Sequence, residues 1–188
     1  MQKRFTTPRF FKKNLGGFTL IEMMVAVSIF VFIVTAGSGI FISSLRVQRQ
    51  GLASQQLLDQ TSYVIEYMSR ALRMAKKDLD GDCISAKLNY EETRAGKGLA
   101  FKNYNNICQE FYWDDINNDQ LKEVVGDTEN FLTSNDLEII SFNINLSGKS
   151  QLDDIQPRVT LSLEIKGEEQ SNIKIQTTVS QRNIDINQ

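Results

Sequence analysis

A stretch of 25 residues from Phe18 to Ile42, with Glu22 as its only charge, constrains this chain more than any other feature. A helix of that length spans about 37 Å at 1.5 Å per residue, which exceeds the ~30 Å hydrocarbon core of a bilayer. The stretch therefore predicts a transmembrane helix, and the residues after it must fold as a domain attached to that helix.

The segment before the apolar stretch is basic and ends in two glycines, Gly16 and Gly17. It contains no acid and five basic residues, Lys3, Arg4, Arg9, Lys12 and Lys13. These charges predict a cytoplasmic N-terminus, with the rest of the chain outside. A secretory signal places its small-residue cleavage site after its apolar region, whereas these glycines precede it. Cleavage at the glycines would leave the apolar helix on the mature protein.

This order of features resembles the N-terminus of the type IV pilin and pseudopilin family. The resemblance rests on Lys12, Lys13, the Gly17–Phe18 junction and Glu22. It implies that residues 1–17 are a leader removed by prepilin peptidase, and that Phe18 becomes the N-methylated first residue. The implied partners are other pilin or pseudopilin subunits, the peptidase, the inner-membrane assembly platform and, before assembly, membrane lipid.

Further segments are similar to the PilW-type minor pilins and the J-type pseudopilins of type II secretion: Glu22–Val27 with Ile29–Phe30, Met68–Arg73 and Ile175–Asn183. The resemblance implies a structural subunit that is not an enzyme and has no cofactor. It also implies a single-pass protein of the cytoplasmic membrane that later enters an extracytoplasmic filament.

Glu22 lies four residues after Phe18, on the same helical face as the amine that cleavage would create. Before cleavage that nitrogen is a neutral amide; afterwards it is a cation, and methylation keeps the charge. In the pilin family this carboxylate pairs with the N-terminus of a neighbouring subunit during assembly. The alternative is a glutamate that lies near the lipid headgroups with no role in assembly.

A second cleavage site competes with the glycine junction. Val34, Thr35 and Ala36 resemble a small-residue site for ordinary signal peptidase, after which the mature chain would begin at Gly37. However, the apolar region would then begin at Phe18 and contain a glutamate, unlike the usual region of 7–15 apolar residues.

After the apolar stretch, mostly apolar residues recur at spacings of three and four, which places them on one face of a helix. They are Leu57, Thr61, Val64, Met68, Ala71 and Ala75. We therefore predict one continuous helix from Phe18 to Lys77, with weak points at Gly37 and Gly39. Four regions follow from this: a leader at 1–17, a membrane and assembly helix at 18–42, an amphipathic second half at 43–77, and a head domain at 78–188.

The head domain has the period-two pattern of strands. Strands are predicted at Gly98–Tyr104, Ile107–Trp113 and Leu121–Val125, with a turn at Asn105 and Asn106 between the first two. The clearest alternation comes later, in Ile140, Phe142, Ile144 and Leu146, then Val159, Leu161, Leu163 and Ile165, then Ile173, Ile175, Thr177 and Val179. The predicted fold is α+β and pilin-like, with a long N-terminal helix packed on an antiparallel sheet.

The chain has two cysteines, Cys83 and Cys108, both in the predicted exported part. In an oxidising compartment an even pair indicates one disulfide, which would stabilise the fold by roughly 3.5 kcal/mol on the chain-entropy model. Two buried free thiols are the alternative.

Charge and composition limit the chemistry. The chain has no histidine, which excludes His-based triads and His metal sites. Without the five leader charges, 16 basic residues face 23 acidic ones, for a net charge of −7. Such an acidic chain does not favour nucleic-acid binding, which needs clustered Lys and Arg.

Three clusters allow other hypotheses. Asp78, Asp80 and Asp82, and likewise Asp115, Asn117 and Asp119, resemble the start of a calcium loop, but neither has the glycine and glutamate that an EF-hand requires. No metal is favoured. Four aromatic residues, Tyr104, Phe111, Tyr112 and Trp113, indicate core packing or, if exposed, a binding patch.

The first functional hypothesis is a structural minor pilin or pseudopilin of a type IV pilus or a type II secretion-like filament. The second is a binding module that the helix presents, for adhesion, DNA uptake or recognition of an exported substrate. A membrane-tethered enzyme is the third, and it would require a cleft with paired carboxylates of raised pKa.

Overall fold

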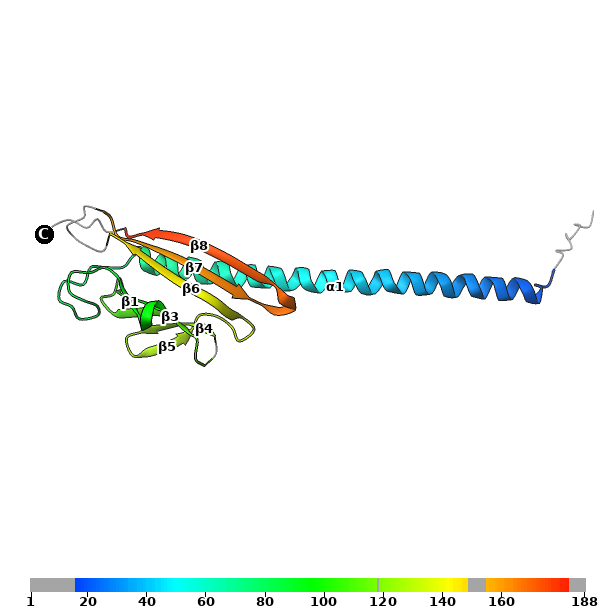
Figure 1. The fold of residues 1–188 in the computed structure, drawn as a ribbon, viewed down its shortest axis with the longest axis horizontal. Coiled ribbons are helices and arrows are strands. Elements are labelled where there is room, and N and C mark those ends of the chain that lie inside the picture. Colours follow the sequence, from blue (N-terminus) through cyan, green and yellow to red (C-terminus); the bar gives the residue numbers. More distant parts are fainter. Residues whose placement is uncertain (1–15, 118, 149–154, 183–188) are drawn as a thin grey trace, which may run out of the picture. The chain divides into compact units, whose positions relative to one another are not determined.

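The computed structural model describes residues 16–117, 119–148 and 155–182. Its longest element is helix α1, which spans Leu20–Arg73 (Figure 1). The chain divides into two compact units, Met1–Arg46 and Val47–Gln188, and α1 contributes residues to both. The helix continues through Gly37 and Gly39, so neither predicted weak point interrupts it.

In the second unit, α1 buries one face among the strands of the head. The buried positions beyond residue 55 are spaced three or four residues apart: Leu57, Thr61, Val64, Met68 and Leu72. The first four match the predicted face, whereas Leu72 is buried in place of Ala71, which is half-buried. Thr61 is the only polar member of this set, and its hydroxyl donates to the Leu57 carbonyl at 2.6 Å. The buried face therefore leaves no unsatisfied hydroxyl in the core.

The helix ends at Arg73, four residues before the predicted end at Lys77, so that boundary was wrong. Donors from other parts of the head form hydrogen bonds with the backbone carbonyls at the C-terminal end of α1. Tyr90 Oη donates to the Leu72 carbonyl at 2.6 Å, the Arg182 amide to the Arg73 carbonyl at 2.8 Å, and Gln181 Nε2 to the Ala75 carbonyl at 2.7 Å. These donors satisfy groups that another helical turn would have used.

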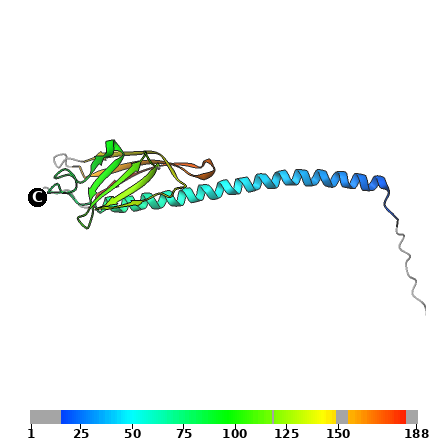
Figure 2. The ribbon, with the colours of Figure 1, turned by 90° about the horizontal axis from the view of Figure 1, so that it is seen from below.

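Five strands form one antiparallel sheet in sequence order. They are β1 (Glu91–Thr93), β2 (Gly98–Lys102), β3 (Cys108–Asp114), β4 (Gln120–Val125) and β5 (Thr128–Phe131), with a short 3-10 helix, η1 (Arg94–Gly96), after β1. Figure 2 shows these strands side by side. The sequence predicts the three central strands but not β1 and β5, which are three and four residues long and mostly polar.

Three longer strands form a second antiparallel sheet, which runs along α1 in Figure 1. They are β6 (Glu138–Ser147), β7 (Arg158–Lys166) and β8 (Asn172–Ser180), with a 3-10 helix, η2 (Glu168–Gln170), between β7 and β8. The single predicted sheet is thus two sheets. Phe101 and Phe111 from the first sheet and Leu161 and Leu163 from the second join the α1 face in one buried cluster. The predicted α+β class, a long N-terminal helix packed on antiparallel strands, is confirmed.

A bulge in β6 changes which residues face the core. The register with β7 shifts between Ile139 and Ser141, so Ile139 and Phe142 are both buried while Ile140 is exposed. Simple alternation had predicted that Ile140 faces inward with Phe142. An extra residue in one strand reverses the side-chain direction before it, which explains the error.

Candidate processing and assembly site

The first turn of α1 is closed by a reciprocal pair of residues, Thr19 and Glu22. The Glu22 amide donates to Thr19 Oγ1 at 3.3 Å, and the Thr19 amide donates to Glu22 Oε2 at 2.9 Å. The Thr19 hydroxyl also lies 3.1 Å from Glu22 Oε2. This is the capping box, in which N-cap and N3 side chains satisfy each other's backbone donors. The Glu22 carboxylate therefore caps its own helix in the single subunit.

The capping box is a functional feature that the sequence reasoning missed. Its signal was present, because a threonine followed three residues later by a glutamate, just before an apolar run, is the pattern for a helix start. The predicted start at Phe18 differs from the observed start at Leu20 because Thr19 serves as the N-cap.

The predicted cleavage junction lies immediately before this cap. Gly16, Gly17 and Phe18 have no regular secondary structure and are exposed, with 82% of Phe18 accessible to solvent. Apart from the two neighbouring residues, no atom of the described part of the chain lies within 4 Å of where a Cβ on Gly17 would stand. The backbone at the junction is thus accessible to an enzyme. Lys12 and Lys13 lie outside the described residues.

The apolar part of α1 has the composition of a membrane helix. Its most apolar 18-residue window has a mean hydropathy of 2.4, and none of that window is buried in the protein. Its hydroxyls bond within the helix: Ser28 donates to the Met24 carbonyl at 2.8 Å, and Ser38 to the Val34 carbonyl at 2.7 Å. Side chains satisfied in this way are compatible with a lipid environment.

A family model described as the prokaryotic N-terminal methylation motif matches residues 12–38. A search of curated proteins and a search of solved structures each found no match. The matched segment holds the glycine junction, the capping box and the first part of the apolar helix. The motif and the helix together support a type IV pilin-like prepilin that is anchored in a membrane.

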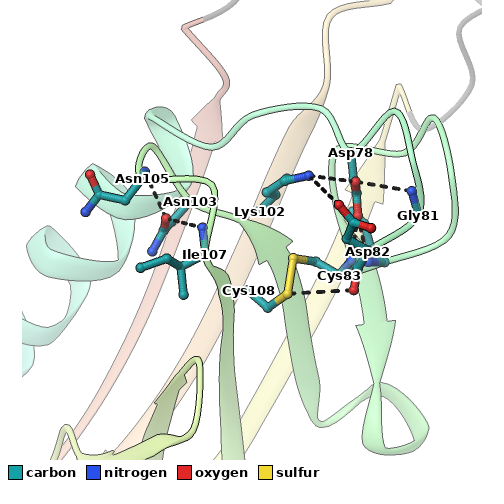
Figure 3. The surroundings of a disulfide bond; sticks show 10 residues. Asp78, Gly81, Asp82, Cys83, Lys102, Asn103, Asn105, Ile107 and Cys108 are labelled. Carbon is teal, nitrogen blue, oxygen red and sulfur yellow. Dashed lines mark hydrogen bonds and ion pairs between the residues drawn. A yellow bond between two sulfur atoms is a disulfide. The ribbon is translucent and has the colours of Figure 1, made fainter.

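In the head domain the predicted disulfide between Cys83 and Cys108 is present, so the alternative of free thiols is wrong (Figure 3). It links the loop after α1 to the first residue of β3. A buried carboxylate, Asp78, orders the same loop by accepting from the amides of Cys83 at 2.7 Å and Ile84 at 3.1 Å. Lys102 on β2 completes the arrangement, with its Nζ 3.1 Å from Asp78 Oδ1.

These contacts change how the first acidic cluster is interpreted. Burial alone would raise the pKa of Asp78, but the Cys83 and Ile84 amides and the Lys102 ammonium together lower it well below its ordinary value. Asp82 also pairs with Lys102, at 3.4 Å. The cation at this cluster is therefore a lysine of the protein, which does not support the calcium hypothesis for Asp78, Asp80 and Asp82.

Asp78 provides a prediction about pH. Its lowered pKa means that its contribution to stability is complete above about pH 4, the ordinary pKa of an aspartate, and is lost as the pH falls below that value. We expect Asp78→Asn to lower the free energy of unfolding by about 2 kcal/mol at pH 7, because charged hydrogen bonds are lost. The difference from the unmodified protein should narrow at pH 2–3.

The measurement is denaturant unfolding of both proteins across this pH range, with Asp80→Asn as the control. Asp80 is an exposed aspartate of the same loop. An equal effect of both substitutions, or a difference that does not change with pH, would contradict the role assigned to Asp78.

The second acidic cluster also bonds to the protein itself. Asp115 forms an ion pair with Lys97, and Asn117 donates through its amide to Asp114 Oδ1 at 3.2 Å. The described residues contain no group of three or more acidic or cysteine side chains placed to hold a metal ion. The structure adds no support for calcium at Asp115, Asn117 and Asp119.

The described carboxylates of the head with shifted pKa values do not have the raised pKa of a general acid. Hydrogen bonds from Lys122 and Asn117 lower the pKa of Asp114 to about 2, and hydrogen bonds from Tyr112 and Lys122 lower the pKa of Glu129. A general acid needs a raised pKa instead. Among the described head residues, each carboxylate pKa that clearly departs from its ordinary value is lowered.

The four aromatic residues differ in how far their side chains are exposed. Phe111 is completely buried, and Tyr112 is buried beneath the Arg94 guanidinium, which lies 3.6 Å from its ring centre. Trp113 is half-buried. Tyr104 is 56% exposed. Core packing therefore explains Phe111, whereas Tyr104 has the exposure that a binding surface requires.

Proposed function

We propose that this protein is a minor pilin or pseudopilin subunit of a type IV pilus or a type II secretion-like filament. Residues 1–17 are its leader, 18–42 its membrane and assembly helix, 43–77 the amphipathic second half, and 78–188 the exported head. The observation that carries the proposal is an exposed Gly17–Phe18 junction, directly before a capped helix whose apolar part, up to Ile42, contains one carboxylate. Filament function in motility, adhesion, DNA uptake or secretion follows from the partners rather than from this site.

The exposed apolar helix is the basis for the sequence of events that we propose. The side chains from Phe18 to Ile42 are exposed in the single subunit, and they need an apolar environment. Lipid provides it in the membrane precursor, with the N-terminus inside. In the filament, helices of other subunits provide it after the assembly platform has extracted the processed chain.

Glu22 has a defined part in this proposal. In the single subunit its carboxylate accepts from the Thr19 amide and faces no cation among the described residues. Cleavage creates an ammonium at Phe18, and an ammonium within a few ångströms of a carboxylate in an apolar environment attracts it strongly. Pairing between the amine of one subunit and Glu22 of the next would align neighbouring helices.

The test is the N-terminus of the protein produced with a prepilin peptidase, determined by sequencing and intact mass. We expect a chain that begins at Phe18 and carries one methyl group. Gly17→Val should block processing, because the proposed peptidase site requires the glycine, and the open space around Gly17 means that the substitution does not disturb the fold. Gly37→Ala is the control, since a Cβ there also meets nothing within 4 Å.

Two results would contradict the proposal. A mature chain that begins at Gly37 would show that ordinary signal peptidase cuts after Ala36. A protein that retains Met1 in the presence of an active prepilin peptidase would show that the junction is not recognised.

A further inference from the structure

The head domain has a groove between the end of α1 and the first sheet. It has a volume of about 420 Å³ and is open to solvent, within the range of small-molecule sites. Its lining includes Tyr67 and Arg70 from α1, and Asn103, Tyr104, Asn105 and Gln109 from the first sheet and its β2–β3 turn. We refer to it as the hairpin groove.

The β2–β3 turn is held rigidly, so that the groove is formed before any ligand arrives. Asn103 is buried, and its Oδ1 accepts from the amides of Asn105 at 2.9 Å and Ile107 at 3.0 Å (Figure 3). Asn106 has a φ of +62°, the left-handed conformation that asparagine tolerates in turns. The disulfide at Cys108 fixes the same end of β3. A preformed site binds at a lower entropic cost.

The amides of the groove have capacity left for a ligand. Asn103 uses only its side-chain carbonyl, so among the described contacts its NH₂ group has no partner. Gln109 donates through Nε2 to Glu123 Oε1 at 2.5 Å, which leaves its own carbonyl oxygen for another donor. The groove therefore presents separate donors and acceptors, supplied by neutral groups.

Two tyrosines give the groove aromatic surface. Tyr67 is fixed, because its hydroxyl donates to Glu123 at 2.7 Å and its ring packs edge-on against Phe111. Burial and the Glu123 carboxylate raise the pKa of Tyr67 to about 12, so this hydroxyl remains protonated and the bond remains intact. Tyr104, by contrast, is 56% exposed on the turn and is free to present its ring to a ligand.

The lining excludes several classes of ligand. It contains no carboxylate, so it does not suit a divalent cation. Its one charged residue, Arg70, pairs with Glu66 on the preceding turn of α1. The groove therefore lacks the clustered cations that bind a phosphate or a nucleic-acid strand. A suitable ligand has many hydroxyls for neutral amides and an apolar face for a tyrosine ring.

We propose that the hairpin groove binds a neutral oligosaccharide. The sugar ring is a compact ligand with hydroxyls that both donate and accept, and its C–H faces pack on aromatic rings. Asn103, Asn105 and Gln109 would bond the hydroxyls, and Tyr104 would pack against the ring. This role goes beyond the filament assembly proposed above.

The test is binding of the full-length protein to an array of neutral oligosaccharides, in micelles of a detergent without a sugar headgroup. The neutral glycan with the strongest signal is then titrated by isothermal calorimetry. We expect Tyr104→Ala to weaken binding about tenfold, the effect of losing one aromatic contact. Tyr104→Phe, which keeps the ring, should retain most of the affinity.

Phe131→Ala is the matched control, because Phe131 on β5 is 58% exposed and does not line the groove. It should bind as well as the unmodified protein. The proposal is overturned if no neutral glycan binds, if only anionic glycans bind, or if Tyr104→Ala and Phe131→Ala have equal effects. Each result is independent of assembly, because the assay uses single subunits that need no filament partners.

Discussion

Glu22→Ala is expected to abolish incorporation into filaments while leaving membrane insertion and leader cleavage intact. The carboxylate is the only charge between Phe18 and Ile42, and the cleaved amine of a neighbouring subunit is its expected partner. The cleavage junction lies outside α1, so removing a side chain inside the helix does not alter it. Insertion depends on the apolar length, which the substitution does not reduce.

Because Glu22 also belongs to the capping box, loss of helix capping is a second explanation for failed assembly of Glu22→Ala. A pair of variants separates helix capping from pairing with the amine. Glu22→Gln keeps an acceptor for the Thr19 amide but loses the charge, since glutamine also serves at the N3 position of a capping box. Thr19→Val keeps the charge but removes the hydroxyl that accepts from the Glu22 amide. If pairing with an amine drives assembly, Glu22→Gln fails as completely as Glu22→Ala, and Thr19→Val still assembles.

The measurement is the fraction of each variant in sheared filaments, relative to the fraction processed in the membrane. Normal incorporation of Glu22→Gln would exclude the ion pair and leave helix capping as the role of Glu22. Normal incorporation of Glu22→Ala would remove this residue from the assembly mechanism altogether.

Phe111→Ala is expected to lower the free energy of unfolding of the head by about 3–5 kcal/mol, the usual cost of emptying a buried phenylalanine site. Phe111 has no exposed surface and lies where α1 meets the first sheet. Its ring contacts Phe101 with centroids 5.5 Å apart and Tyr67 at 6.1 Å. Deleting it would remove contacts from both elements at once.

The chain provides its own probe for this measurement. Trp113 is the sole tryptophan and lies two residues after Phe111 on β3, so its fluorescence during denaturant unfolding reports on the head. Phe131→Ala is again the control, and it should change stability by no more than about 0.5 kcal/mol because Phe131 is exposed. A loss below about 1 kcal/mol for Phe111→Ala would contradict the packing described above.

Much of the fold is readable from the sequence because it depends on local periodicity. The buried face of α1 and the strands β7 and β8 follow regular spacings of apolar residues, and both are observed. The errors arise where contacts between residues far apart in the sequence determine the local structure. The helix ends at Arg73 because Tyr90 and Gln181 supply donors there, and no local pattern contains that information.

The same distinction applies to the candidate site. The junction at Gly17 and Phe18 can be predicted because it is a contiguous motif, and the disulfide because the chain has only two cysteines. The pairing of Asp78 with Lys102 joins residues 24 positions apart, and it depends on the path of the loop. The hairpin groove likewise needs α1 and β3 to be placed together before Tyr67 and Tyr104 can be seen as neighbours of one cavity.

The closure of the helix end also sets an order of events in biosynthesis. Gln181 bonds to the carbonyl of Ala75, a residue made 106 positions earlier, and Arg182 bonds to that of Arg73. These two hydrogen bonds can therefore form only after Gln181 and Arg182 have left the ribosome. Closure of the helix end is thus a late step in the folding of the head, because it joins residues that are far apart in the sequence.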